Sequence, residues 1–147
     1  MFWKIFFLIM LPLNLWGSCP ELAGDYICTD QERTFLQIIR SVDLKDFKVF
    51  IYMDEDNGRL DYFVANGEER DFITEAEGYT IIGKIISTCE NDKLISTMRG
   101  KIKGLDYEIE YNLETFKKGA TLITNTKILV NSGYFSSNQA ECNPVEK

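Results

Sequence analysis

The feature of this 147-residue chain that most constrains its fold is the alternation of apolar and polar side chains after Cys19. The clearest run reads Tyr107, Glu108, Ile109, Glu110, Tyr111, Asn112 and Leu113. Every second residue of a strand points to the same face, whereas a helix repeats about every 3.6 residues. Phe47–Met53 and Leu122–Ile128 show the same period of two, so the sequence predicts an all-β fold.

Turn residues separate these segments about every eight to twelve positions, which is typical of short strands joined in series. The strongest signal is Asn66-Gly67, which predicts a two-residue type I′ hairpin between Leu60–Ala65 and Glu68–Thr74. Gly83 interrupts an apolar run and predicts a bend or bulge. We expect about ten strands and little helix, since no window has a convincing helical pattern; Leu36–Val42 is the most ambiguous segment.

A meander of this length has two exposed edges unless the sheet closes on itself. We therefore expect one antiparallel up-and-down β-barrel of about eight to ten strands, with a two-layer sandwich as the second possibility. A chain of about 150 residues removes roughly two-thirds of its unfolded surface from water, enough for a real core. Residues 19–147 are predicted to form this single domain.

The first 18 residues have the composition of a secretory signal peptide. Lys4 is their one charge, and the apolar run Ile5–Leu15 is shorter than the roughly 20 residues that span a bilayer. Residues 1–18 are thus expected to be removed, which places the protein in the periplasm or outside the cell. Leu15–Cys19 is also a poor version of a lipoprotein signal, so acylation of Cys19 is a minor alternative.

Four cysteines, Cys19, Cys28, Cys89 and Cys142, fit two disulfides in an oxidising compartment. Their spacings match no zinc pattern. Three connectivities are open. Antiparallel pairing of the first and last strands would favour Cys19–Cys142 with Cys28–Cys89.

The composition excludes several classes of function. Without histidine there is no Ser-His-Asp triad, Cys-His dyad or histidine-ligated metal. A net charge of −7 repels phosphate backbones, so nucleic acid is not an expected partner. With no catalytic motif or cofactor fingerprint either, we expect a protein that is not an enzyme and has no cofactor or metal.

Several short motifs resemble the lipocalins and related calycins, notably small secreted bacterial proteins of that type. Gly24-Asp25-Tyr26 is similar to the Gly-x-Trp that opens their first strand, with Tyr in place of Trp. Asn66-Gly67, Asp92-Lys93-Leu94 and Gly119–Leu122 are similar to their later hairpins and strand starts. The resemblance implies a barrel that binds a small hydrophobic ligand.

Aromatic side chains on the predicted strands either line a ligand cavity or fill the core. The set is Tyr26, Phe47, Tyr62, Phe72, Tyr79, Tyr107 and Tyr111. Gln37, Ser96 and Thr124 fall on apolar faces, where a ligand, a backbone group or water would have to satisfy them. Arg99 would hold a ligand carboxylate if it lay at the barrel mouth; the alternative is an outward charged face.

Two carboxylate groupings invite a chemical interpretation but also have a simpler one. Glu108 and Glu110 share a strand face, as an acid and base for glycoside hydrolysis would, yet alternating Glu is ordinary on a solvated face. Asp54–Gly58 offers carboxylates for calcium, but it lacks the spacing of an EF-hand and suits an acidic turn.

The leading hypothesis is an exported, non-enzymatic binding protein that holds a lipid or fatty-acid-like molecule inside a β-barrel. The alternative is an envelope or secreted protein–protein interaction module with a solid core.

Overall fold

The computed structural model describes residues 19–56, 58–76 and 78–146, so the predicted signal peptide lies outside the described residues. Its ten strands are β1 (Gly24–Thr29), β2 (Thr34–Asp43), β3 (Lys48–Asp54), β4 (Arg59–Val64), β5 (Arg70–Ala76), β6 (Tyr79–Glu90), β7 (Lys93–Ile102), β8 (Glu108–Lys118), β9 (Thr121–Val130) and β10 (Gly133–Pro144). The all-β prediction is confirmed, and the ambiguous Leu36–Val42 lies within β2. The described residues include no helix long and apolar enough to cross a membrane.

All ten strands belong to one antiparallel sheet in the order β4-β3-β2-β1-β10-β9-β8-β7-β6-β5. Sequence neighbours pair along the meander, and β1 pairs with β10, so the first and last strands meet in the middle of the sheet. The predicted antiparallel up-and-down architecture is therefore confirmed, in the form of a curled half-barrel. Closure is incomplete, because no ladder joins β4 to β5 within the described residues.

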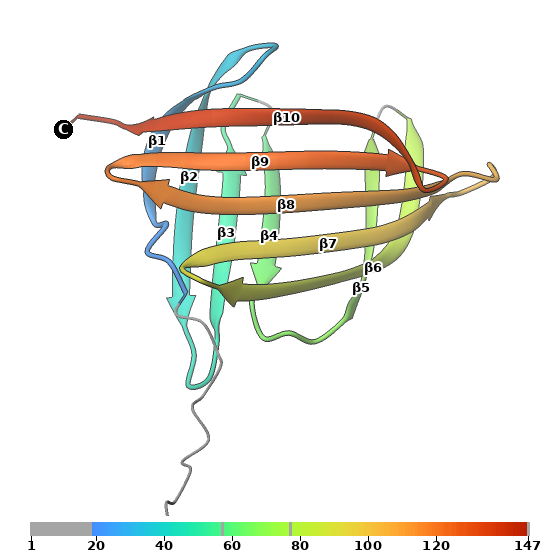
Figure 1. The fold of residues 1–147 in the computed structure, drawn as a ribbon, viewed down its shortest axis with the longest axis horizontal. Helices are drawn as coiled ribbons and strands as arrows, with labels where there is room; N and C mark the ends of the chain where they lie inside the picture. Colours follow the sequence, from blue (N-terminus) through green and yellow to red (C-terminus); the bar gives the residue numbers. More distant parts are fainter. Residues whose placement is uncertain (1–18, 57, 77, 147) are drawn as a thin grey trace, which may run out of the picture.

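The sheet curls into two layers that cross. In Figure 1, β1–β4 run steeply behind, β7–β10 run across the front, and β6 curves between the two directions. Gly83 of β6 lies opposite Gly100 of β7, and a Cβ atom on Gly83 would stand 2.1 Å from the carbonyl oxygen of Arg99. The backbones approach so closely there that only glycine fits. The register of β6 with both neighbours is continuous through Gly83, so the glycine marks this close approach and not a bulge.

The connection between β4 and β5 is not the predicted hairpin. The Asn66 side-chain oxygen accepts a hydrogen bond from the Glu68 amide, while the Gly67 amide donates to the carbonyl of Ser87 on β6 (2.9 Å each). The turn is thus bound to β6 and does not close a β4–β5 ladder. Asn-Gly chemistry specifies a tight turn, but tertiary contacts decide which strands pair across it.

A side chain bridges the open seam between β4 and β5. Arg70 at the beginning of β5 donates from Nη2 to the carbonyl oxygen of Tyr62 on β4 at 2.6 Å. Its guanidinium also lies 4.3 Å from the centroid of the Tyr62 ring. One arginine therefore occupies part of the hydrogen-bonding edge that a neighbouring strand would otherwise use.

Two disulfides join the elements, as the cysteine count predicted, but the favoured pairing was wrong. The bonds are Cys19–Cys89 and Cys28–Cys142. The β1–β10 ladder places Cys28 directly opposite Cys142, which leaves Cys19, just before β1, to reach the end of β6. The first and last strands do pair, as assumed, but the register brings the second cysteine, not the first, to the last one.

Candidate functional site

The inner face of the sheet is the candidate site, and its covering differs along the strands. On β6–β9 the side chains nearest the β1–β4 layer are almost fully buried, including Ser87, Leu94, Ser96, Thr115 and Leu122. We call this region the covered half. Each of these five residues is 2% exposed or less. A ligand could therefore enter the covered half only if side chains were displaced.

The segment Cys19–Ala23 seals the covered half, and we call it the plug. Leu22 has no exposed surface, and the Tyr26 hydroxyl donates to its carbonyl oxygen at 2.9 Å. Cys19 fixes the segment to β6, and Lys48 of β3 pairs with Glu21. The Glu21 carboxylate raises the pKa of Lys48 above its ordinary value, so this ion pair favours the closed arrangement.

The polar side chains inside the covered half satisfy one another. The Ser87 and Ser96 hydroxyls share a hydrogen bond of 2.6 Å, and those of Thr115 and Thr124 one of 3.3 Å. Gln37 donates from Nε2 to the carbonyl of Met53 at 2.9 Å. The internal polar groups that suggested a bound ligand therefore have partners in the protein itself.

The hydroxyl of Tyr52 is an exception to this pattern. Its hydroxyl is fully buried and has no partner in hydrogen-bonding geometry among the described residues. Burial raises the pKa of Tyr52 strongly, an effect that the nearby Thr115 hydroxyl offsets only in part. The phenol is thus neutral at every physiological pH.

Beyond the reach of β1–β4, the inner face remains half-buried. This region, the open trough, consists of Phe72, Ile81, Met98, Ile102, Ile109, Tyr111, Ile128 and Val130. Phe72, Met98 and Tyr111 also pack against the core, so they form the boundary between the two halves. All eight side chains are apolar or aromatic, which suits a hydrophobic ligand.

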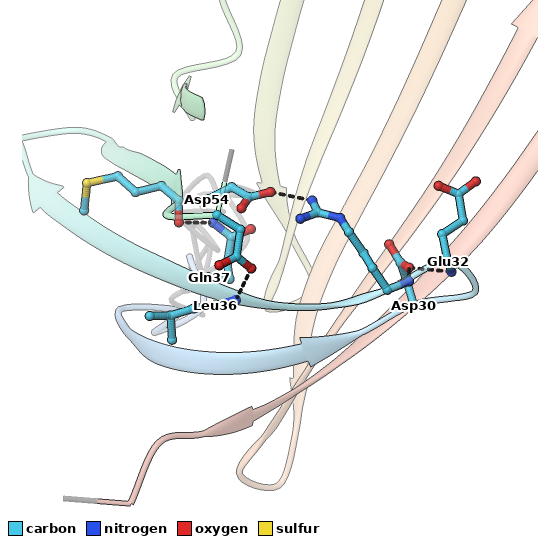
Figure 2. Close-up of polar contacts among 8 residues, drawn as sticks. Asp30, Glu32, Leu36, Gln37 and Asp54 are labelled. Atoms are coloured by element: carbon cyan, nitrogen blue, oxygen red, sulfur yellow. Dashed lines mark hydrogen bonds and ion pairs between the residues drawn. The ribbon is translucent and has the colours of Figure 1, made fainter. Parts of the chain in front are cut away.

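A polar corner lies at the ends of β2 and β3, where the β1–β2 hairpin approaches them (Figure 2). Arg33 pairs with the buried Asp54 at 2.5 Å, and its guanidinium lies 4.3 Å from the Phe35 ring centroid. The Leu36 amide donates to Asp56 at 3.4 Å. Arg33 neutralises Asp54, but Asp30, Glu32 and Asp56 lie in the same corner and leave it acidic, so it would not attract the carboxylate of a fatty acid.

The structure distributes the predicted ligand-binding residues over three environments. Tyr111 lies in the open trough, whereas Tyr26 is buried in the core. Tyr79 and Tyr107 stand at strand ends and are 51% and 47% exposed. The remaining two, Tyr62 and Arg99, lie on the outer face. Phe72 was also among the aromatic candidates. Met98 and Ile81 were not predicted, because they are aliphatic residues of the same alternating faces and aromatic side chains alone do not mark them.

The candidate carboxylates form ion pairs on the outer face. Arg99 Nε pairs with Glu110 at 3.0 Å, and Lys101 with Glu108 at 3.4 Å. Hydrogen bonds from Asn112 and Arg99 lower the pKa of Glu110, whereas a general acid near neutral pH needs a raised pKa. This is the geometry of a charged ladder on a solvated strand face.

Two hollows of a few hundred Å³ open on the sheet, and their walls include many outer-face side chains. The larger, of about 480 Å³, is lined by Gln31, Ile95, Asn112, Leu113, Glu114, Asn125, Thr126, Lys127, Ser137, Asn138 and Gln139. The second, of about 420 Å³, includes Ile82, Arg99, Lys101, Glu108, Glu110 and Leu129. Polar and charged side chains of the outer face contribute much of both walls, and of the trough residues only Ile109 lines one of these two hollows.

Comparison with known proteins identifies the fold. No family model matches the chain, and no curated protein does. Among solved structures, human cRBP IV superposes with a TM-score of 0.56 and 12% identity, over 85% of this chain and 98% of that chain. At this identity the likeness concerns architecture alone: the chain has a lipocalin-like, calycin-type β-barrel fold.

Proposed function

We propose that this protein binds a small hydrophobic molecule, of lipid or fatty-acid type, in the open trough. The observation that carries the proposal is the change along the inner face: apolar side chains that continue the core remain half-buried where β1–β4 no longer cover them. A ligand lying there would bury them at roughly 25 cal/mol per Å² of apolar surface. The shared fold with a cellular retinol-binding protein supports the same class of ligand.

The proposed binding is non-enzymatic and takes place after export. Two disulfides support an oxidising compartment, hence the periplasm or the exterior. Removal of residues 1–18 as a signal peptide, leaving the domain from Cys19, belongs to this proposal.

Organic extraction of the natively purified protein, followed by mass spectrometry, tests for a retained lipid. Titration with a fluorescent fatty-acid analogue should give saturable binding that Tyr111→Ala weakens by roughly tenfold, since about 1.4 kcal/mol of contact is worth that factor. Tyr62→Ala is the matched control, because Tyr62 lies on the outer face and is 51% exposed. Ile109→Gln provides a second trough variant if Tyr111→Ala lowers the melting temperature. Absence of saturable binding in the parent protein would refute the proposal.

A protein–protein interaction module is the second candidate, supported by the solidly packed covered half. It predicts no extracted lipid and no effect of trough variants. A partner would instead use the outer face or the unpaired edges of β4 and β5.

A further inference from the structure

Exposed apolar side chains gather on the connections at one end of the sheet. Tyr134 and Phe135 follow the β9–β10 turn and are each 68% exposed. Leu105 and Tyr107 lie on the β7–β8 connection at 43% and 47%, and Tyr79 follows the β5–β6 turn at 51%. We call these five residues the aromatic rim.

Backbone contacts hold the three connections together. The Asn131 amide donates to the Glu108 carbonyl at 2.8 Å, and the Glu108 amide donates to the Asn131 side-chain oxygen at 3.0 Å. The Lys103 amide donates to the Thr80 carbonyl at 2.8 Å, which joins the β7–β8 connection to β6. The rim is therefore one ordered surface, and in Figure 1 the β7–β8 and β9–β10 turns project beside each other from the right of the sheet.

The β9–β10 hairpin, which carries Tyr134 and Phe135, has few charged residues. Ile128–Ala140 contains no Asp, Glu, Lys or Arg, in a chain where 27% of residues are charged. The β7–β8 connection does carry charges: Lys103 and Asp106 flank Leu105, and Lys101 pairs with Glu108 at 3.4 Å. These four charges are two positive and two negative, so they sum to zero. Large exposed aromatic side chains on a surface without net charge indicate a region that is covered by an apolar partner.

We propose that the aromatic rim docks on the surface of a neutral lipid bilayer. Projecting turns with Tyr and Phe suit the membrane interface, where amphipathic rings insert at the headgroup level, better than they suit a rigid protein face. Because the open trough begins directly behind the rim, at Ile109 and Val130, docking would place the trough at the source of its ligand. The position of the trough matters only if the proposed function holds; the docking itself does not depend on it.

The chain's net charge of −7 predicts which membranes are bound. An anionic surface repels the protein within a Debye length of about 8 Å at physiological salt. We therefore expect flotation with phosphatidylcholine vesicles to recover more protein than flotation with vesicles that contain phosphatidylserine, and the difference to shrink at high salt.

The decisive variant is Tyr134→Ser with Phe135→Ser. It should weaken partition to phosphatidylcholine vesicles at least about tenfold, because it removes the two most exposed rings that the rim would bury in the bilayer. The control is Val42→Ser with Leu44→Ser, because these apolar residues are also exposed (47% and 48%) but lie at the opposite end of the strands. The control should float like the parent. Equal flotation of both variants, or no flotation of the parent, would overturn the docking.

Ligand titration without vesicles separates the two proposals. The rim variant should bind the fluorescent fatty acid like the parent, because Tyr134 and Phe135 are outside the trough. If the parent protein binds the fatty acid but does not float with vesicles, membrane docking is refuted and the proposed ligand binding is not. A third outcome is that the parent protein self-associates and does not float with vesicles, while the rim variant no longer self-associates. The rim would then be a protein–protein contact, and the docking proposal would be wrong.

Discussion

The covered half and the open trough are built from the same strands, yet they differ in what completes them. In the covered half, β1–β4, the plug and both disulfides enclose the inner face, and Leu94 and Thr115 have no exposed surface. In the trough, the same alternating faces continue without a second layer. The difference teaches that alternation specifies an inner face, while the length and placement of the opposite strands decide whether that face becomes core or binding surface.

The largest expected effect comes from opening the covered half. Cys28→Ser with Cys142→Ser removes the covalent link between β1 and β10, which joins positions 114 apart in the sequence, and should cost about 2–5 kcal/mol of unfolding free energy. Denaturant unfolding without reductant measures this. Cys19→Ser with Cys89→Ser removes the shorter loop of 70 residues and should cost no more. Full stability of the Cys28/Cys142 variant would show that the strand ladder alone holds the two ends together.

A matched pair of isoleucines compares the halves directly. Ile39→Ala in the core, at 0% exposure, should cost about 2–5 kcal/mol through lost burial and a cavity. Ile109→Ala, half-buried in the trough, should cost less than half of that. Both values come from the same denaturant titration, and equal losses would mean that the trough is packed as tightly as the core.

Two tyrosines test how polar groups behave within the covered half. Tyr26→Phe removes the hydrogen bond to the Leu22 carbonyl and should cost about 0.5–1.5 kcal/mol. Tyr52→Phe removes a buried hydroxyl that lacks a partner, so its stability should be unchanged or higher. A melting temperature clearly lowered by Tyr52→Phe would reveal that this hydroxyl has a partner.

The smallest expected effect is electrostatic and concerns the plug. Lys48 has a raised pKa when folded, so its contribution to stability is fully present below its ordinary pKa of 10.5. That contribution should disappear as the pH rises through the folded-state value. Unfolding midpoints measured between pH 9 and 11.5 should fall less steeply in Glu21→Gln than in the parent. Identical pH profiles would mean that the ion pair does not help to hold the plug.

The strands and the order of the meander were predictable from sequence, because alternation and turn residues act locally. Asn66-Gly67 shows the limit of prediction from local sequence. The residues form a turn as expected, but the Gly67 amide donates a hydrogen bond to Ser87 of β6, and β4 and β5 do not pair across the turn. The cysteine pairing failed for a similar reason. A register places Cys28 opposite Cys142, and no spacing along the chain encodes a register.

The candidate site was less predictable than the fold. Tyr26 and Tyr111 have the same residue type on predicted strands, yet one is core and the other lines the trough, because only the three-dimensional position of β1–β4 separates them. Arg99 was considered for an inward role, although Lys101 two residues later already indicated an outward charged face. Its partner Glu110 lies across a ladder that only the structure reveals.

The incomplete closure between β4 and β5 has a consequence for how copies of this protein coexist. Two free strand edges are templates on which another chain could add a strand and begin an ordered aggregate. Arg70 donates to the Tyr62 carbonyl on one edge, and the acidic residues Glu68, Glu69 and Glu75 lie on or beside the other. Mutual repulsion of these charges keeps like molecules from pairing edge to edge, so the seam remains open in a crowded compartment without becoming a site of polymerisation.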